Sequence, residues 1–213
     1  MNTVKIKICG LTREEDVNAA IDAGADVLGF VFTSSPRRIT SETAIRLLGG
    51  VPGGVLRVGL FLNQDRAEIE QVISSVPLDV LQFHGSESAA ECEVYGLPWL
   101  KAVAMENSHS AMLAESAYPG AMGLLLDSHK TGKRGGSGKV FDWSFSSPQS
   151  KPVWLAGGLH EGNVARAIRT VRPYAVDVSS GVEAAPGIKD AAKIAAFVKA
   201  VREVESELSD GSK

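Results

Sequence analysis

Short apolar runs rich in β-branched residues recur along the chain, and a stretch with helical spacing of apolar positions follows each of them. The starts of these runs lie about 20 to 30 residues apart, which is the length of one strand–helix unit. The runs predict eight strands, at Val4–Ile8, Val27–Val31, Val55–Leu60, Val80–Phe83, Leu100–Val103, Gly123–Leu126, Val153–Ala156 and Ala175–Val178.

Between these strands the pattern predicts amphipathic helices. Thr12 and Glu15 have the spacing of a capping box, which predicts a helix over Arg13–Ala23. The other predicted helices cover Ser41–Leu48, Arg66–Ser74, Ser88–Tyr95, Ser108–Ser116, Asn163–Val171 and Lys189–Val204.

Strands that alternate with helices form a parallel sheet, either open and doubly wound or closed into a barrel. Eight units, with no GxGxxG fingerprint after the first strand, favour closure. We therefore expect an α/β fold, a single-domain (β/α)8 TIM barrel over residues 1–205. Residues 206–213 are polar and should form a frayed C-terminal tail.

Composition narrows the class of protein. A chain of 213 residues with 44% hydrophobic composition can bury a sizeable core, although about 250 residues are usual for such a barrel. The net charge of −3 is spread along the chain, which argues against a nucleic-acid partner. No apolar run is long enough for a signal peptide or a membrane span, so we expect a cytoplasmic protein.

Polar residues fall near the C-terminal ends of several predicted strands, where barrels of this type carry their catalytic groups. Because side chains alternate across a strand, Ile6 and Ile8 should face the helices while Lys7 and Cys9 point into the barrel. The other strand-end residues with polar side chains are Gln82, His84, Asp127 and Asp177. A lone histidine is more often a core residue than a catalytic one, so we give His84 no catalytic role.

Two small-residue loops predict a phosphate site. Gly157 and Gly158 end the seventh strand, and Ser179, Ser180 and Gly181 end the eighth. These two loops form the common phosphate site of such barrels, and glycine lets backbone N–H groups approach an anion closely. The expected ligand is a phosphorylated small molecule.

Several motifs along the chain resemble those of a known family. The motifs KICG with Leu11 and Thr12, GFVF followed by SPR, QFHG, LLLD, GGSGKVFDW, and DVSSGVE followed by PG resemble those of phosphoribosylanthranilate isomerases, in the same order. The resemblance implies that Cys9 is the general base, that Asp127 is the general acid, and that Arg37 holds the substrate's anthranilate carboxylate. Phe83 and Arg38 depart from the family pattern, and Arg37 is preferred to Arg38 because it follows the Ser-Pro pair.

The resemblance also implies the reaction, an Amadori rearrangement of N-(5′-phosphoribosyl)anthranilate in tryptophan biosynthesis. The iminium formed on ring opening serves as the electron sink, so the chemistry needs no cofactor. We expect a monomer or homodimer. No metal site is expected, because the two cysteines and the scattered histidines lack ligand spacing.

Several alternatives remain open at this stage. Lys7, Arg57, Lys101 and Asp177 could instead form a self-neutralising buried ionic layer, and Asp177 could either support the barrel or contact substrate. A histidine-pathway aminoaldose isomerase would carry an aspartate in place of Cys9, and indole-glycerol-phosphate synthase would need a lysine and glutamate set that the chain does not display. A non-enzymatic phosphate-binding barrel is the third alternative. Ser128–Lys139 has no apolar periodicity and is interpreted as a mobile lid.

Overall fold

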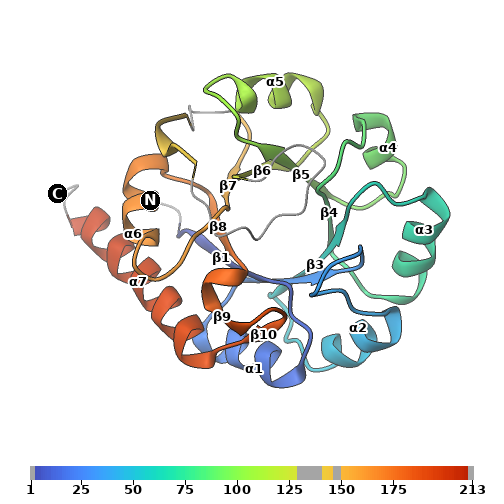
Figure 1. Ribbon diagram of the computed structural model, residues 1–213, viewed down its shortest axis with the longest axis horizontal. Coiled ribbons are helices and arrows are strands. Elements are labelled where there is room, and N and C mark those ends of the chain that lie inside the picture. Colours follow the sequence, from blue (N-terminus) through green and yellow to red (C-terminus); the bar gives the residue numbers. More distant parts are fainter. Residues whose placement is uncertain (1–2, 129–140, 146–149, 211–213) are drawn as a thin grey trace.

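Eight parallel strands close into a barrel in the computed structural model, which describes residues 3–128, 141–145 and 150–210. The first strand pairs with both the second and the eighth, and this pairing closes the ring. Figure 1 shows the ring with the helices outside it. The strands are β1 Lys5–Cys9, β2 Val27–Val31, β3 Leu56–Phe61, β4 Val80–Phe83, β5 Trp99–Ala104, β6 Gly123–Asp127, β7 Val153–Leu155 and β8 Ala175–Val178. The predicted fold class is confirmed.

The helices between the strands are short, which is how a chain of this length completes a barrel. The shortest, α4, has five residues, Ala89–Glu93, and begins at a capping box formed by Ser88 and Glu91. The other α-helices are α1 Glu14–Ala23, α2 Ser41–Leu48, α3 Arg66–Ser75, α5 Ser110–Ala117, α6 Val164–Val171 and α7 Ala191–Asp210, and two 3₁₀ turns cover Trp143–Phe145 (η1) and Ser180–Val182 (η2).

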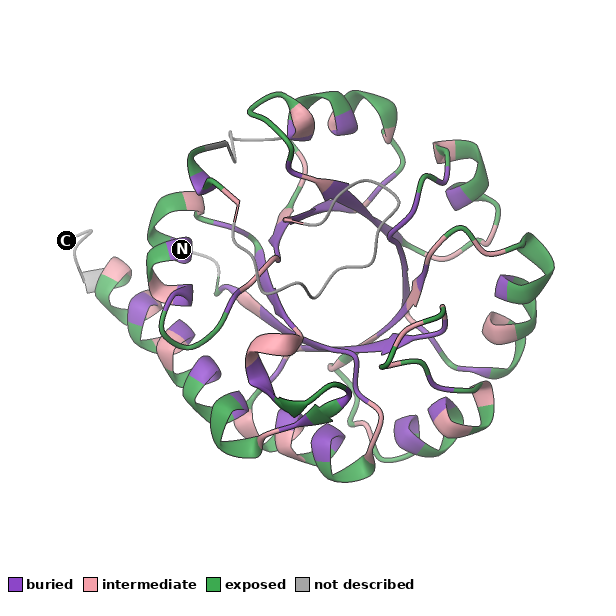
Figure 2. Cartoon of the chain, in the orientation of Figure 1, coloured by how far each residue is buried: buried purple, intermediate pink, exposed green. Residues whose placement is uncertain are grey.

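The alternation of side chains along the strands divides the core in two. Figure 2 shows that the strands of the ring are mostly buried, while the helices around it also carry exposed residues. Ile6 and Ile8 belong to the larger cluster, which fills the space between strands and helices. A smaller cluster fills the barrel interior, with Val27, Val58 and Trp154 among its members. The polar residues at the C-terminal ends of the strands point into the same interior, where this packed apolar layer lies below them.

Three local expectations were wrong. Thr12 and Glu15 form no capping box: the helix begins after Arg13, and the Thr12 hydroxyl donates to the Gly187 carbonyl instead. Lys189 belongs to a small hairpin of β9 Glu183–Ala185 and β10 Ile188–Lys189, not to the last helix. That helix, α7, begins at Ala191 and continues to Asp210, so residues 206–210, expected in a frayed tail, are helical. The expected lid, apart from Ser128, lies outside the described residues.

The proposed ionic layer also proved to be three separate pairs. Lys7 is buried inside the barrel, where its Nζ lies 2.9 Å from Asp177 Oδ1. Lys101 faces outward and pairs with Glu87 at 3.0 Å. Arg57 pairs with Asp79 near the N-terminal ends of β3 and β4, where both side chains are partly exposed. These outward positions follow from strand parity, because Val58 and Leu100 are the neighbours that point inward.

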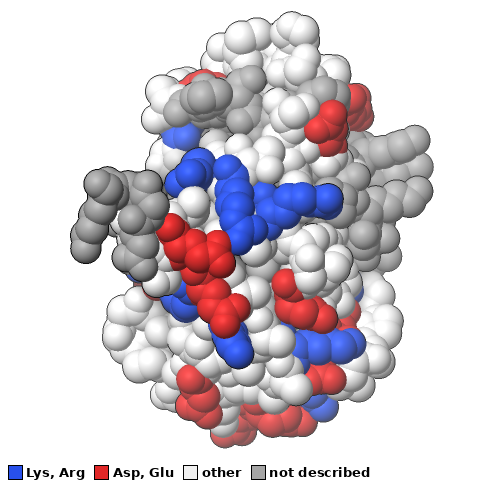
Figure 3. All heavy atoms as spheres, turned by 90° about the vertical axis from the view of Figure 1, so that its left-hand side faces the viewer, with Lys and Arg blue, Asp and Glu red and all other residues white. Residues whose placement is uncertain are grey.

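The surface over α6 and α7 carries both signs of charge, close together (Figure 3). Arg169 on α6 forms an ion pair with Glu207 on α7, for example. Among the described helices, none combines the length and apolar character needed to cross a membrane.

Candidate active site

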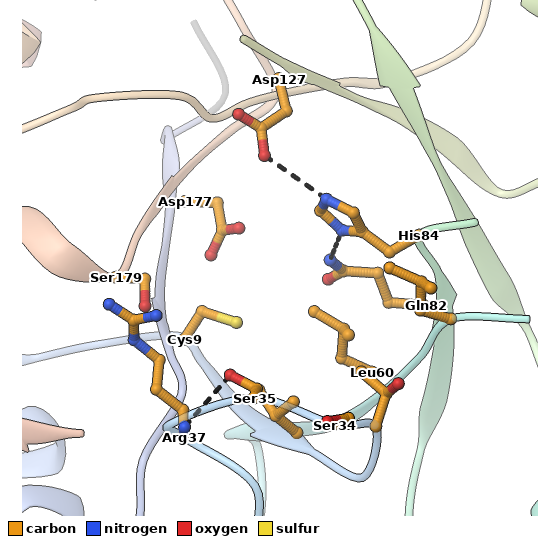
Figure 4. A pocket seen from close by; sticks show the side chains of 13 residues that line it. Cys9, Ser34, Ser35, Arg37, Leu60, Gln82, His84, Asp127, Asp177 and Ser179 are labelled. Atoms are coloured by element: carbon orange, nitrogen blue, oxygen red, sulfur yellow. Dashed lines mark hydrogen bonds and ion pairs between the residues drawn. The ribbon is translucent and has the colours of Figure 1, made fainter. Parts of the chain in front are cut away.

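A pocket opens at the C-terminal ends of the strands, inside the barrel (Figure 4). It brings together five of the residues to which the sequence analysis gave a catalytic or binding role, namely Cys9, Arg37, Asp127, Asp177 and Ser179. The remaining lining residues are Val31, Thr33, Ser34, Ser35, Leu60, Leu62, Gln82 and His84.

Cys9 ends β1, and its sulfur points into the cavity (Figure 4). Its neighbour across the sheet is Gly29, which has no side chain and so leaves room for the sulfur. Burial raises the pKa of the Cys9 thiol, and the opposing positive charges of Lys7 and Lys189 do not reverse the shift. Lys7 therefore favours the thiolate, as expected, but burial outweighs its effect.

Asp127 ends β6 on the opposite side of the cavity from Cys9 (Figure 4). His84 Nε2 lies 3.6 Å from Asp127 Oδ2, and His84 Nδ1 lies 3.3 Å from Gln82 Nε2. The imidazole thus lies between the side-chain amide of Gln82 and the carboxyl group of Asp127. All three side chains are largely buried.

Arg37 and Arg38 have different surroundings. Arg37 lines the pocket, and its guanidinium donates two hydrogen bonds of 2.7 Å to Glu183. Arg38 is exposed and is not among the residues that line the pocket. The hydrogen bonds to Glu183 raise the pKa of Arg37, so the guanidinium stays cationic.

The two small-residue loops lie side by side after β7 and β8, and of their predicted phosphate-binding residues only Ser179 lines the pocket. Gly157 and Gly158 have φ angles of 84° and 66°, in the left-handed region that favours glycine. A Cβ on Gly181 would lie 1.9 Å from the Leu159 carbonyl oxygen, so the loop after β8 packs directly on the loop after β7. Ser179 lines the pocket, and Ser180 and Gly181 follow it in η2.

Asp177 lies in the pocket wall and forms the ion pair with Lys7 described above. Burial opposes the charge on Lys7, but Asp177 and Cys9 raise the pKa of Lys7 overall. Asp177 therefore both supports the barrel interior and faces the cavity.

Sequence reasoning missed three features of this site. Gln82 and His84 were noted for their shared parity, and that parity was the signal for their place in the pocket. Glu183 belongs to the DVSSGVE motif but was given no role, and its partner Lys189 was predicted in the last helix. In the apolar wall formed by Val31, Leu60 and Leu62, the first two were predicted only as strand residues, and Leu62 lay outside the predicted strands.

The described residues include no group of three or more His, Cys, Asp or Glu side chains placed to hold a metal ion. The polar groups of the pocket include a carboxyl group, a thiol and a histidine facing one cavity, an arrangement suited to proton transfer.

The sequence profile of the N-(5′-phosphoribosyl)anthranilate (PRA) isomerase family matches residues 6–200. The chain belongs to this family. An N-(5′-phosphoribosyl)anthranilate isomerase from Pseudomonas fluorescens (strain Pf0-1) is 53% identical over 205 residues, covering 95% of this chain and 100% of that protein. Its counterpart from Pseudomonas aeruginosa (strain UCBPP-PA14) is 50% identical and covers 95% and 97%.

Solved structures of the family superpose closely on this barrel. Phosphoribosylanthranilate isomerase from Thermotoga maritima has a TM-score of 0.86 and 42% identity, covering 94% of this chain and 100% of that one. A further isomerase structure, in complex with reduced 1-(o-carboxyphenylamino)-1-deoxyribulose 5-phosphate, has a TM-score of 0.83 and 38% identity, with the same coverage.

Proposed function

We propose that this protein converts N-(5′-phosphoribosyl)anthranilate to 1-(2-carboxyphenylamino)-1-deoxyribulose 5-phosphate in tryptophan biosynthesis, by general acid–base catalysis. The observation that carries the proposal is the placement of Cys9 and Asp127 on opposite sides of one pocket. Membership of the isomerase family supports the reaction, and the product analogue bound by a solved relative supports the substrate.

Asp127 is the general acid. It donates a proton to the furanose ring oxygen, and the ring opens to a protonated Schiff base between the anthranilate nitrogen and C1′. The carboxyl group must be protonated to act as the acid, and His84 Nε2 lies 3.6 Å from its Oδ2. A positioned acid of this kind contributes about 10²- to 10⁴-fold to the rate.

Cys9 is the general base. The iminium draws electrons from C2′, so the thiolate can remove the C2′ proton from the opposite side of the sugar. As the C2′–H bond breaks, its electron pair forms the C1′=C2′ double bond of an enolamine, and the π electrons of the iminium become the lone pair of the anthranilate nitrogen. Protonation of the enolamine at C1′ and loss of the proton from the C2′ hydroxyl then give the ketose. Because the substrate supplies this electron sink, the chemistry needs no cofactor and no metal.

The remaining pocket residues bind the ends of the substrate. Arg37 pairs with the anthranilate carboxylate, and the apolar wall of Val31, Leu60 and Leu62 receives the aromatic ring. The phosphate is bound by backbone N–H groups of the two adjoining loops, Gly157–Gly158 and 179–181. Asp177, which faces the same cavity, contacts the sugar. We expect the enzyme to work in the cytoplasm as a monomer or a homodimer.

The test is the turnover of conservative variants. Cys9→Ser and Asp127→Asn keep side-chain size but remove the base and the proton donor, so each should lower kcat by at least about 10²-fold. Cys92→Ser is the matched control, because Cys92 is also buried but lies on α4, outside the pocket. A Cys9→Ser or Asp127→Asn protein with native circular dichroism and wild-type kcat would remove that residue from the mechanism.

A further inference from the structure

Glu183 is the last residue of the DVSSGVE motif, and the mechanism above gives it no role. It begins β9, and its side chain is only 6% exposed. The carboxylate accepts hydrogen bonds from Arg37 Nε and Nη2, at 2.7 Å each, from Lys189 Nζ at 2.9 Å, and from the Gly187 N–H at 3.2 Å. One buried carboxylate thus joins the loop after β2 to the hairpin that follows β8.

The geometry of the pair leaves part of the guanidinium available. A guanidinium has five N–H donors in one plane, and Glu183 occupies the edge formed by Nε and Nη2. Within the described part of the chain, the structure gives no hydrogen bond to Arg37 Nη1. The edge formed by Nη1 and the second Nη2 hydrogen can therefore receive another carboxylate in a two-pronged pair.

Close packing against Gly10 also restrains the Arg37 side chain. A Cβ on Gly10, in the KICG motif, would lie 2.5 Å from Arg37 Cδ. The aliphatic part of Arg37 therefore lies directly against the backbone of Gly10, beside the catalytic strand end. Glu183 at the guanidinium and Gly10 along the aliphatic part together restrict the orientation of the Arg37 side chain.

Glu183 also offsets the positive charges of Arg37 and Lys189. Lys189 is buried, and besides Glu183 its Nζ contacts the Ser179 carbonyl at 3.1 Å. Burial would raise the pKa of Glu183, but Arg37 and Lys189 lower it overall, so the glutamate stays ionised. Without this negative charge, the buried ammonium of Lys189 would face the partly buried guanidinium of Arg37 with nothing between them to offset the repulsion.

We propose that Glu183 is a positioning residue, which orients the Arg37 guanidinium so that its outer edge meets the carboxylate of the substrate's anthranilate ring. This inference rests on the carboxylate-binding role proposed for Arg37. Glu183 acts before chemistry begins, so its loss should weaken binding and leave the proton transfers unchanged.

The test measures binding of two probes to folded variants by titration calorimetry. One probe is reduced 1-(o-carboxyphenylamino)-1-deoxyribulose 5-phosphate, and the other is the same compound without the ring carboxylate. For Glu183→Gln we expect about a tenfold rise in Kd for the first probe, equal to about 1.4 kcal/mol, and an unchanged Kd for the second. Steady-state kinetics should show a similar rise in KM with kcat within about twofold.

Asp79→Asn is the matched control. The Arg57–Asp79 pair has the same two-pronged geometry on Nε and Nη2, at 2.8 and 2.7 Å, but lies at the opposite end of the barrel. This variant should bind both probes as the wild type does. Glu183→Asp serves if Glu183→Gln fails to fold, because it keeps the charge beside Lys189 while its shorter side chain cannot reach Arg37 with both oxygens. It should give the same loss, confined to the carboxylate-bearing probe.

The outcomes separate the two proposals. Equal weakening of both probes in the glutamate variants would mean a purely structural role and would overturn the inference, as would wild-type affinity for the carboxylate-bearing probe. Arg37→Ala tests the underlying assignment: if this variant binds the carboxylate-bearing probe as tightly as the wild type, the role of Arg37 fails first. A loss in Arg37→Ala without a loss in either glutamate variant would reject Glu183 alone.

Discussion

Gly29→Ala should disable the enzyme by moving Cys9, although Gly29 itself carries no chemistry. Gly29 lies opposite Cys9 in the register of β1 and β2. A Cβ at this position would lie 2.8 Å from Cys9 Sγ and 3.0 Å from Cys9 Cα. Ordinary contacts of this kind are about 3.5 to 4.0 Å, so the cysteine must move by roughly 0.7 Å or more.

The size of the effect follows from that displacement. A shift of about 1 Å in a catalytic group can cost about 10²-fold in rate, and we expect kcat to fall by that order. Crowding a packed interior costs about 1 to 3 kcal/mol, which lowers Tm by roughly 2 to 12 °C in a chain of this size.

The assay is kcat at a temperature where circular dichroism shows the variant folded, together with a thermal melt. Gly53→Ala is the control, because a Cβ there has open space and the residue is not among the glycines with positive φ. It should leave both quantities near wild type. Wild-type kcat and Tm in Gly29→Ala would refute the argument that close packing at Gly29 holds the Cys9 sulfur in place.

Three further predictions concern binding and pH. Arg37→Ala should raise KM at least tenfold while Arg38→Ala changes KM little, since Arg37 lines the pocket and Arg38 is exposed outside it. Steady-state kinetics on both variants is the test, and a larger rise in KM for Arg38→Ala would give the carboxylate-binding role to Arg38. The alkaline limb of the kcat/KM profile should lie above the ordinary thiol pKa of about 8.5, because burial raises the pKa of Cys9. Above the pKa of Cys9 the thiolate fraction no longer grows while the protonated acid becomes scarcer, so the rate falls only there. An alkaline limb below about 8.5 would contradict the assignment of Cys9 as the base. A sulfate-soaked crystal should show the anion on the backbone N–H groups of Gly157–Gly158 and 179–181, and density only at the opposite barrel face would disprove the phosphate site.

The alternation of side chains made most of the barrel predictable from the sequence. Inward and outward positions alternate along every strand, so parity placed Lys7 and Cys9 inside and Ile6 and Ile8 against the helices. The same parity put Asp127 and Asp177 at the mouth of the pocket, since strand ends meet at one face of a closed barrel.

Contacts between distant segments were the part that could not be predicted. Arg37 and Glu183 are 146 positions apart, and the sequence around either residue does not predict its contact with the other. Lys189 has the spacing of a helix with the residues that follow it, yet its backbone N–H donates to Asp16 and its ammonium to Glu183, and these long-range bonds keep it in the hairpin. Thr12 has a capping-box sequence, but its hydroxyl bonds the Gly187 carbonyl of the same hairpin.

The place of His84 in the pocket was only partly predictable from the sequence. Its parity with Gln82 was visible in the sequence, but its significance depends on Asp127, which comes from another strand two places around the ring. A lone histidine at the end of a strand carries information about function only when its neighbours in space are known.

The most direct test of the whole account is the anthranilate fluorescence of phosphoribosylanthranilate after the purified wild-type protein is added. Fluorescence should decay as the substrate is converted to the ketose, with no added metal or cofactor, and Asp127→Asn should slow the decay by at least about 10²-fold. Fluorescence that stays constant with the folded wild-type protein would contradict the proposed activity.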